Sequence, residues 1–285
     1  MDRETQFMEL RPQLFRLAYR MIGTRADAED TVQEAFVRWQ RAAEDEIRSP
    51  KSYLTTVVAR LSLDTLKSAS RKREVYVGPW LPEPIVEPLG TSSVEMAESL
   101  SLAFLHLLES LSPAERLAFI LREVFDTPYE EVASALETSE VNCRQIVARA
   151  SKHIREHRPR FPVDRDRHRG VLHNFLQACA SGDPSQLMSL LREDVVLRSD
   201  GGGKTAAALN PIYGADRVAR FFAGIVRKGT AAGLRAKFAM VNGEPGALLY
   251  NGNQLTTVIT VLLDDDGRIA GIFVIVNPDK LPRNI

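Results

Sequence analysis

Apolar residues recur at steps of three and four along the first part of the chain, which is the spacing of one buried helix face. The pattern predicts helices over residues 7–23, 25–43 and about 50–70, with Gly23 ending the first. Helices resume at about residue 93 and continue to about residue 158. We therefore expect the N-terminal half to be entirely helical.

The C-terminal part follows a different pattern. Two further helices are expected, at about residues 168–180 and 185–191. Runs rich in β-branched residues then predict strands at residues 195–199, 235–241, 247–250, 255–263 and 269–276. The sequence "DDDG" at 264–267 predicts a hairpin turn between the last two. Helices followed by a meander of strands indicate an α+β fold with helices on one face of a curved sheet.

Two breaks divide these patterns. "YVGPWLPEPIVEPLG" (residues 76–90) is rich in proline and is predicted to be an extended linker, and "RPRFPVDRD" (158–166) is the second break. We expect two all-α domains, residues 1–74 and 95–160, a linker at 75–94, and an α+β domain at 164–285.

Composition and charge narrow the class of protein. The 285 residues are 44% hydrophobic and 26% charged, values typical of globular proteins. The N-terminus has no secretory signal pattern, the longest apolar run (269–276) is too short to cross a bilayer, and there are only two cysteines. These features predict a cytoplasmic protein without a membrane segment.

The formal net charge is +0, which argues against a protein that binds nucleic acid alone through one large basic surface. Basic residues nevertheless gather at 144–169 and at 71–73. Local basic patches on a neutral chain favour a DNA reader that works as a subunit of a larger assembly.

The segment that begins "LSPAER" carries the pattern of a helix-turn-helix. Ser112 and Glu115 form a capping box before its first helix. A short helix is predicted at 128–136, and the turn that follows has Glu137 where a glycine often lies. Ser139 is expected to cap the next helix. The alternative is an ordinary helical hairpin with a solvated basic face.

In a helix-turn-helix, the early residues of the second helix face base edges, and basic residues behind them contact phosphates. Arg, Asn and Gln side chains can read guanine and adenine through paired hydrogen bonds. We predict base contacts by Asn142, Arg144 and Gln145, and phosphate contacts by Arg149 and Lys152.

Two longer motifs extend this interpretation. "DAEDTVQEAFVRW" (27–39) and "SPKSYLTTVVARLSLDTLKS" (49–68), followed by a linker and the "LSPAER" helix-turn-helix, resemble the extracytoplasmic-function (ECF) sigma factors of bacteria. The resemblance covers residues 1 to about 160. It implies a sigma factor that binds core RNA polymerase, at the β′ clamp helices and the β flap, and directs promoter-specific initiation on promoter DNA.

The resemblance also implies roles for individual residues. Contacts to the clamp helices are expected from Asp30, Gln33, Glu34 and Arg38, although the pattern alone would indicate a solvated acidic helix face. The third helix and the loop before it would read the −10 element by trapping a flipped base and holding the single strand. The expected −10 residues are Arg48, Lys51, Ser52, Arg60 and Lys67, with Arg71 and Arg73 on phosphates.

Three short motifs, "WLPEP" (80–84), "DGGGK" (200–204) and "NPDKL" (277–281), resemble the SigJ-type subfamily, which carries a fused SnoaL-like domain. This implies a cone-shaped α+β fold of the nuclear-transport-factor-like type for the last domain, and regulation of the sigma factor in cis. The expected inter-domain residues are Trp80, Pro82, Asp200, Gly201, Gly202, Gly203, Lys204, Asn277, Asp279 and Lys280.

The sequence gives less support to other functions. "DGGGK" lacks the glycine spacing of a nucleotide-binding loop. His173 and Asp200 are candidate pocket residues, but no acid–base pair has a sequence rationale, so no catalytic residue, cofactor or metal is predicted.

The alternatives are a one-component helix-turn-helix regulator with a ligand-binding C-terminal domain, and a polyketide-cyclase-like enzyme. The acidic clamp-binding helix favours the sigma factor. Whether the last domain binds a small ligand is left open, as is a redox role for Cys143, for which a buried inert thiol is the alternative.

Overall fold

The computed structural model describes residues 2–43, 47, 49–73, 75–89, 101–157, 164–229 and 233–282, with side chains omitted at 69–73 and 157. The chain forms two compact units. The first unit consists of Met1–Val75 with Leu105–Arg158, and the second of Tyr76–Phe104 with Pro159–Ile285. The proline-rich segment thus belongs to the same unit as the C-terminal sheet.

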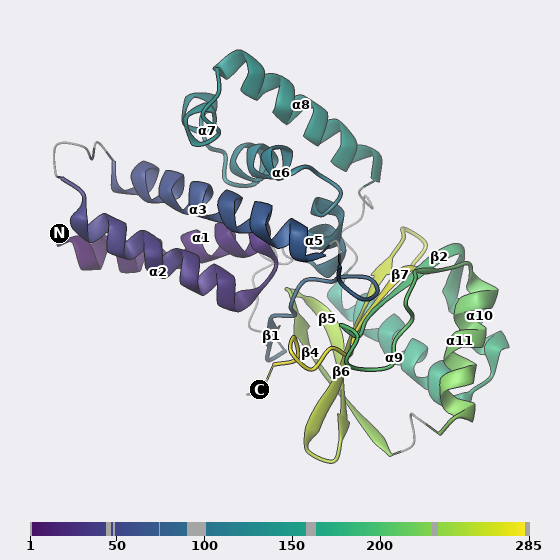
Figure 1. Ribbon diagram of the computed structural model, residues 1–285. Helices are drawn as coiled ribbons and strands as arrows, with labels where there is room; N and C mark the ends of the chain where they lie inside the picture. Colours follow the sequence, from purple (N-terminus) through teal and green to yellow (C-terminus); the bar gives the residue numbers. More distant parts are fainter. Residues whose placement is uncertain are drawn as a thin grey trace. The chain divides into compact units, whose positions relative to one another are not determined.

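Three helices open the first unit: α1 (Arg3–Ile22), α2 (Arg25–Arg41) and α3 (Pro50–Arg73) (Figure 1). They confirm the three predicted helices, although α1 begins earlier than the apolar pattern indicated. Its start is fixed by Asp2, whose carboxylate accepts the Thr5 amide at 2.7 Å. Gly23 ends the helix in a left-handed conformation, with φ at 83°.

The rest of the first unit contains the last residues of α5 (Leu102–Leu108), then α6 (Pro113–Phe119), a π-helical turn η2 (Ile120–Val124), α7 (Tyr129–Ala135) and α8 (Glu140–His157). The predicted helix-turn-helix is therefore present as α7 and α8, and the capping box at Ser112 is confirmed. Glu137 has a φ of 53°, which explains why a glycine is favoured at that position of the turn.

The second unit is built on one seven-stranded sheet with the order β1-β4-β5-β6-β7-β2-β3. Its strands are β1 (Val86–Glu87), β2 (Leu191–Asp200), β3 (Ile212–Tyr213), β4 (Leu234–Val241), β5 (Glu244–Asn251), β6 (Gln254–Leu263) and β7 (Ile269–Ile275). Neighbouring strands are antiparallel except β2 and β7, which are parallel.

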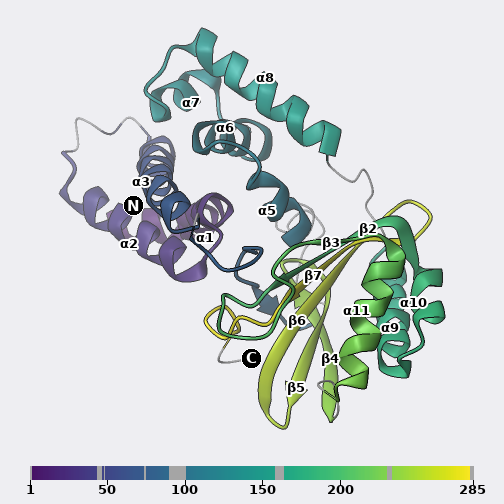
Figure 2. The same ribbon diagram turned by 45° about the vertical axis from the view of Figure 1, so that its right-hand side comes forward.

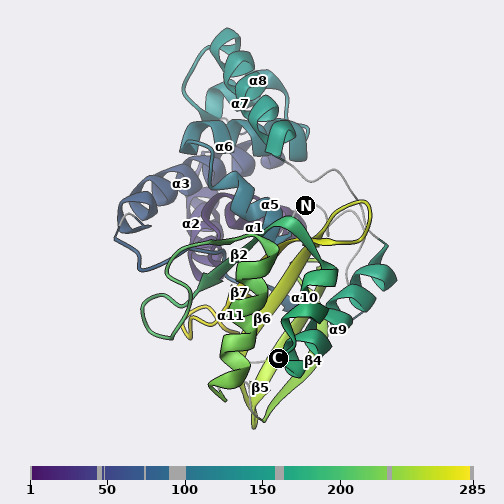
Figure 3. The ribbon, with the colours of Figure 1, turned by 90° about the vertical axis from the view of Figure 1, so that its right-hand side faces the viewer.

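Three helices cover one face of this sheet: α9 (Arg165–Ser181), α10 (Pro184–Leu190) and α11 (Ala215–Arg227) (Figure 2; Figure 3). The core between helices and sheet includes Leu172, Phe175 and Ile272, all fully buried. This arrangement confirms the predicted α+β class.

A second apolar cluster lies on the other face of the sheet. Leu81 from the linker and Leu102 from the start of α5 pack there with Val241, Leu248 and Phe273 of the strands. The described part of the linker, residues 75–89, contains no helix, and Leu81 packs on the sheet.

The structure adds three elements that the sequence analysis did not predict. Helix α11 was missed although Val218, Ala219 and Phe222 are buried at helical spacing. The short strands β1 and β3 were missed because two residues carry no periodic signal, and their pairing partners lie far along the chain. Within the described residues, no helix is long and apolar enough to cross a membrane.

Candidate functional site

The exposed half of α8 carries the five predicted DNA-contacting residues. Asn142, Arg144 and Gln145 lie in its first two turns and are exposed. The Asn142 amide donates to the Thr138 hydroxyl at 2.8 Å, and Arg144 Nη2 donates to the Glu140 carboxylate at 3.1 Å. Neighbouring side chains therefore hold two of the three predicted base readers near the start of the helix.

Arg149 and Lys152 follow on the next turns of α8. Their side chains are 63% and 78% exposed, and each is 3.9 Å from a carboxylate, of Glu115 and Glu156 respectively. Such long, exposed ion pairs contribute little to stability. Both cations are available to a polyanion.

The predicted polymerase contacts share one exposed strip of α2. Asp30, Gln33, Glu34 and Arg38 are exposed, and Arg38 Nε donates to Glu34 at 2.9 Å. The opposite side of the helix is buried in the bundle through Trp39 and its apolar neighbours.

The predicted −10 residues on α3 fall into two groups. Lys51 and Lys67 are exposed to solvent. The Ser52 hydroxyl instead donates to Glu131 of α7 at 2.7 Å, and Arg60 Nη2 donates to the backbone carbonyl of Ser134 at 2.8 Å. Two predicted strand-binding side chains thus contact the helix-turn-helix.

Arg60 also lies 3.8 Å from the Glu137 carboxylate in the turn of the helix-turn-helix. Arg48 lies outside the described residues. Arg71 and Arg73 are described only as backbone of α3.

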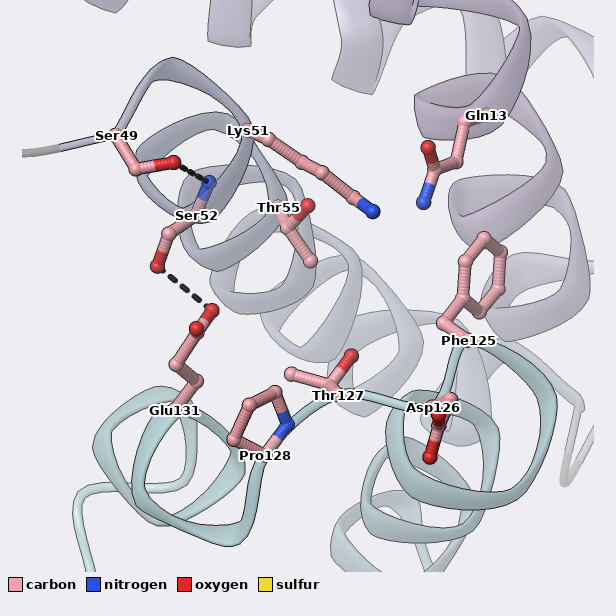
Figure 4. A pocket seen from close by; sticks show the side chains of 10 residues that line it. All are labelled: Gln13, Ser49, Lys51, Ser52, Thr55, Phe125, Asp126, Thr127, Pro128 and Glu131. Atoms are coloured by element: carbon pink, nitrogen blue, oxygen red, sulfur yellow. Dashed lines mark hydrogen bonds between the residues drawn. The ribbon is translucent and has the colours of Figure 1, made fainter.

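A pocket of about 130 Å³ lies between α3 and the helix-turn-helix (Figure 4). Lys51 and Gln13 extend toward each other across one side of it, and Asp126 and Glu131 belong to the opposite wall. Both carboxylates have partners, since Glu131 accepts the Ser52 hydroxyl and Asp126 lies 3.1 Å from Arg122 Nη1.

A buried arginine joins α6 to α1 in the first unit. Arg116 of α6 is 1% exposed and donates from Nη2 and Nε to the Arg20 carbonyl of α1, at 2.7 and 3.0 Å. It also bonds to Glu109. The Arg20 guanidinium lies 5.2 Å from the centre of the Phe125 ring, and burial lowers the pKa of Arg20 to about 10.

In the second unit, Asp200 holds the linker. It is fully buried at the end of β2, and its carboxylate accepts the Tyr76 hydroxyl at 2.5 Å and the Leu81 amide at 2.8 Å. Lys280 Nζ donates to Asp200 at 2.7 Å and to the Leu81 carbonyl at 2.5 Å. Both polar groups of the Leu81 backbone are therefore bonded. We call Tyr76, Leu81, Asp200, Asn277 and Lys280 the linker-docking site.

Aromatic side chains complete the linker-docking site. The Lys280 ammonium lies 4.2 Å from the centre of a Trp80 ring and 5.0 Å from that of Tyr76, within the range of cation–π attraction. Asn277 donates to the Tyr76 hydroxyl at 2.8 Å. Burial, and then the hydrogen bond to Asp200, raise the pKa of Tyr76, so its hydroxyl remains a donor at neutral pH.

The glycines of "DGGGK" allow this packing. A Cβ atom on Gly201 would overlap the Thr205 carbonyl, and one on Gly202 would overlap the Asn277 side chain. Gly202 and Gly203 also have positive φ angles of 58° and 71°. Lys204 is 56% exposed and pairs with Asp279 at 2.5 Å. The motif is a close-packed support for the linker, with one exposed ion pair at its end.

The second half of the linker is held by the sheet. Ile85 and Asn242 exchange two hydrogen bonds, at 3.0 and 2.8 Å, and β1 pairs with the end of β4. Pro82, between the two attachments, is buried.

The side chains that could have been reactive, His173 and the two cysteines, pack against other residues of the fold. His173 is exposed and packs beside Phe238 at 5.9 Å. Cys143 is fully buried, and burial raises the pKa of its thiol; burial also raises the pKa of Cys179. Both effects favour inert thiols. The described part of the chain contains no group of three His, Cys, Asp or Glu residues placed to hold a metal ion.

Comparisons with known proteins agree with this geometry. Residues 6–72 match the Sigma-70 region 2 family, and residues 101–154 match Sigma-70, region 4. The chain is 39% identical to the ECF RNA polymerase sigma factor SigJ of Mycobacterium tuberculosis, over 97% of this chain and 92% of SigJ. The chain belongs to the ECF sigma factors.

Further similarities span nearly the whole sigma factor. A probable ECF sigma factor, SigI of Mycobacterium tuberculosis, is 34% identical over 95% of this chain and 92% of its own length. The crystal structure of Mycobacterium tuberculosis SigJ superposes with a TM-score of 0.78 at 37% identity, covering 97% of both chains. The C-terminal α+β domain is therefore part of the architecture that this sigma factor shares with SigJ.

A sigma factor directs core RNA polymerase to promoters, and this is the function of the chain. The comparisons do not favour the one-component regulator. They also place the chain in a family whose members are not enzymes.

Sequence reasoning missed several residues at these sites. The linker is held through hydrogen bonds of Tyr76, Leu81 and Asn242. Tyr76 lies outside the "WLPEP" motif, and the sequence around Asn242 indicates only a turn. Glu131 and Arg116 join the two sigma regions. The buried position of Arg116 within the "LSPAER" motif had no signal in the apolar pattern, because arginine is normally exposed.

Proposed function

We propose that this sigma factor reads the −35 element with α8 and the −10 element with α3, and that it binds the β′ clamp helices through the exposed strip of α2. The exposure of Asn142, Arg144 and Gln145 at the start of α8 supports the first assignment. The strip formed by Asp30, Glu34 and their neighbours supports the last.

We further propose that the first unit is in a closed state that must open before both elements can be read. The −35 and −10 positions are about 25 base pairs apart, which is about 85 Å along B-DNA at roughly 3.4 Å per base pair. Ser52 of α3 and Glu131 of α7 lie 2.7 Å apart. The two readers cannot occupy both elements while this contact exists, and this observation carries the proposal.

The C-terminal domain would control that opening through the linker. Tyr76 and Leu102, near the two ends of the connection between α3 and α5, both belong to the second unit. A domain of this size is about 40 Å across. While both ends are docked, they cannot separate further than this domain allows.

A released linker would remove the limit. Residues 74–101 could span at most about 95 Å when extended, which is enough to reach both promoter elements. Docking at Asp200 and Lys280 is therefore expected to favour the closed state.

Reconstituted transcription with core RNA polymerase tests both parts of this proposal. It should compare the full chain with a truncation that ends before Asp164. The full chain is expected to initiate at specific promoters. The truncation lacks the sheet on which Leu81 and Leu102 pack, so its amount of transcript is expected to differ from that of the full chain. If neither protein supports promoter-specific initiation, the promoter-reading assignment fails. If the two behave identically, regulation in cis is excluded.

A further inference from the structure

The side chain of Arg144 is held by two neighbours although it is 58% exposed. Its guanidinium carbon lies 4.2 Å from the centre of the Tyr129 ring, at the first residue of α7. Its Nη2 donates to Glu140 at 3.1 Å, one turn earlier on α8. The guanidinium of Arg122 also lies near this tyrosine ring, at 4.9 Å from its centre, and is farther away than that of Arg144.

These contacts leave Arg144 able to bind a base. A guanidinium that rests on an aromatic ring uses its flat face, while its N–H donors lie in the plane and point outward. Glu140 engages the donor Nη2. Guanine is read by two parallel N–H donors at O6 and N7, a geometry that a fixed arginine can offer without first losing rotamer freedom.

We propose that Tyr129 is a positioning residue for promoter recognition: its ring fixes Arg144 so that this arginine discriminates one base pair of the −35 element. The inference rests on the proposed role of α8. It deepens that role by assigning specificity to a residue outside the recognition helix. Tyr129 acts through Arg144, without a base contact of its own.

The test uses the full chain with core RNA polymerase and a set of promoters in which each −35 base pair is changed in turn. Arg144→Ala identifies the base pair that Arg144 reads. Tyr129→Leu should weaken discrimination at that same base pair by about twofold to fivefold, the range expected for an exposed cation–π contact. Tyr129→Phe, which keeps the ring, should retain discrimination.

Two controls separate positioning from a general packing defect. Arg122→Gln removes the other cation beside the same ring and should leave the base preference unchanged. The double variant Tyr129→Leu/Arg144→Ala should discriminate no worse than Arg144→Ala alone, because the tyrosine would act only through the arginine. Melting temperatures of the variants check that each one folds.

Different failures point to different errors. If Arg144→Ala weakens binding uniformly across all promoters, the proposed base-reading role of Arg144 on α8 is wrong. If Arg144→Ala is specific to one base pair but Tyr129→Leu is uniform, or Tyr129→Phe behaves like Tyr129→Leu, only the positioning role is overturned.

Discussion

Two lysine–aspartate pairs beside the "DGGGK" loop differ in burial although they are close in sequence. The Lys280 and Asp200 side chains are 9% and 0% exposed, whereas those of Lys204 and Asp279 are 56% and 59% exposed. Removing one partner of a buried pair leaves an uncompensated charge, while an exposed pair is screened by water. At the residue scale, Lys280 therefore stabilises linker docking far more than Lys204 does.

The variant Lys280→Met is expected to lower the free energy of unfolding of the second unit by about 3–5 kcal/mol. The matched control Lys204→Met should change it by less than about 1 kcal/mol. Urea denaturation followed by Trp80 fluorescence, in a Trp39→Phe background, measures both. If both substitutions changed the free energy of unfolding equally, the buried Lys280–Asp200 pair would not be the stronger of the two contacts.

A buried histidine predicts how the stability of the second unit depends on pH. His168 is 6% exposed, its Nε2 atom lacks a hydrogen-bond partner among the described residues, and burial lowers its pKa to about 4 from 6.5. Below pH 6.5 the unfolded chain binds a proton that the folded one does not. Stability therefore falls as the pH decreases.

The expected loss from His168 is about 2 kcal/mol between about pH 7 and pH 5. Denaturation curves at several pH values, for the wild type and for His168→Gln, measure this contribution. The variant should have a flatter pH dependence in that window. Identical slopes would show that His168 titrates normally in the folded protein.

At the scale of elements, we expect the contact between α3 and α7 to decide whether promoter DNA can reach α3. Ser52 donates to a carboxylate of the helix-turn-helix, and Arg60 donates to one of its backbone carbonyls. Each of these hydrogen bonds contributes little net free energy, so α3 and α7 can separate when polymerase and DNA offer stronger partners. The buried Arg116 contact to the Arg20 carbonyl is expected to resist separation more.

A reversible crosslink tests whether this separation is required. Ser52→Cys combined with Glu131→Cys places thiols on α3 and α7 at positions whose native side chains meet, and a short bifunctional thiol reagent with a cleavable disulfide can span the remaining gap. The crosslinked protein is expected to lose promoter-specific transcription, and cleavage of the reagent should restore it. Each single substitution, treated with the same reagent, is the control for modification without a crosslink.

Full transcription by the crosslinked double variant would show that α3 and α7 can remain in contact during initiation. The closed-state proposal would then be wrong, although the sigma-factor function would stand.

At the scale of the whole molecule, we expect the linker to couple promoter reading to the C-terminal domain. Tyr76 and Leu102 both belong to the second unit, so docking would limit the distance between α3 and α8. A promoter with a longer spacer needs a larger distance. Weakening the docking site should therefore widen the range of spacer lengths that the protein tolerates.

We expect Lys280→Met to raise transcription from promoters whose spacer is lengthened by a few base pairs, relative to transcription from the native spacer. In vitro transcription from a series of spacer variants measures this ratio. Lys204→Met should keep the wild-type ratio. An unchanged ratio for Lys280→Met would show that linker docking does not limit the distance between α3 and α8.

The sequence by itself determined the local elements and their chemistry. Helices α1, α2, α3 and α8 follow from apolar spacing, and α6 follows from its capping box at Ser112, because these signals lie within a few residues of one another. The side-chain types on α8 predicted a DNA-facing surface, and the structure places those side chains on its exposed half. Each of the three short motifs contributes a residue to the contacts around Asp200: Trp80 and Asp200 themselves, and Lys280 between them.

Only the tertiary structure decided which residues meet. Asp200 bonds to Leu81 across 119 positions and to Lys280 across 80, and Ser52 reaches Glu131 across 79. Local periodicity encodes which face of an element is buried, but it carries no information about the partner that covers that face. Val86 and Glu87 became strand β1 because β4 offered an open edge. The first half of the linker is held elsewhere on the sheet, where a buried carboxylate beside the "DGGGK" loop and an ammonium group bond to the Leu81 backbone.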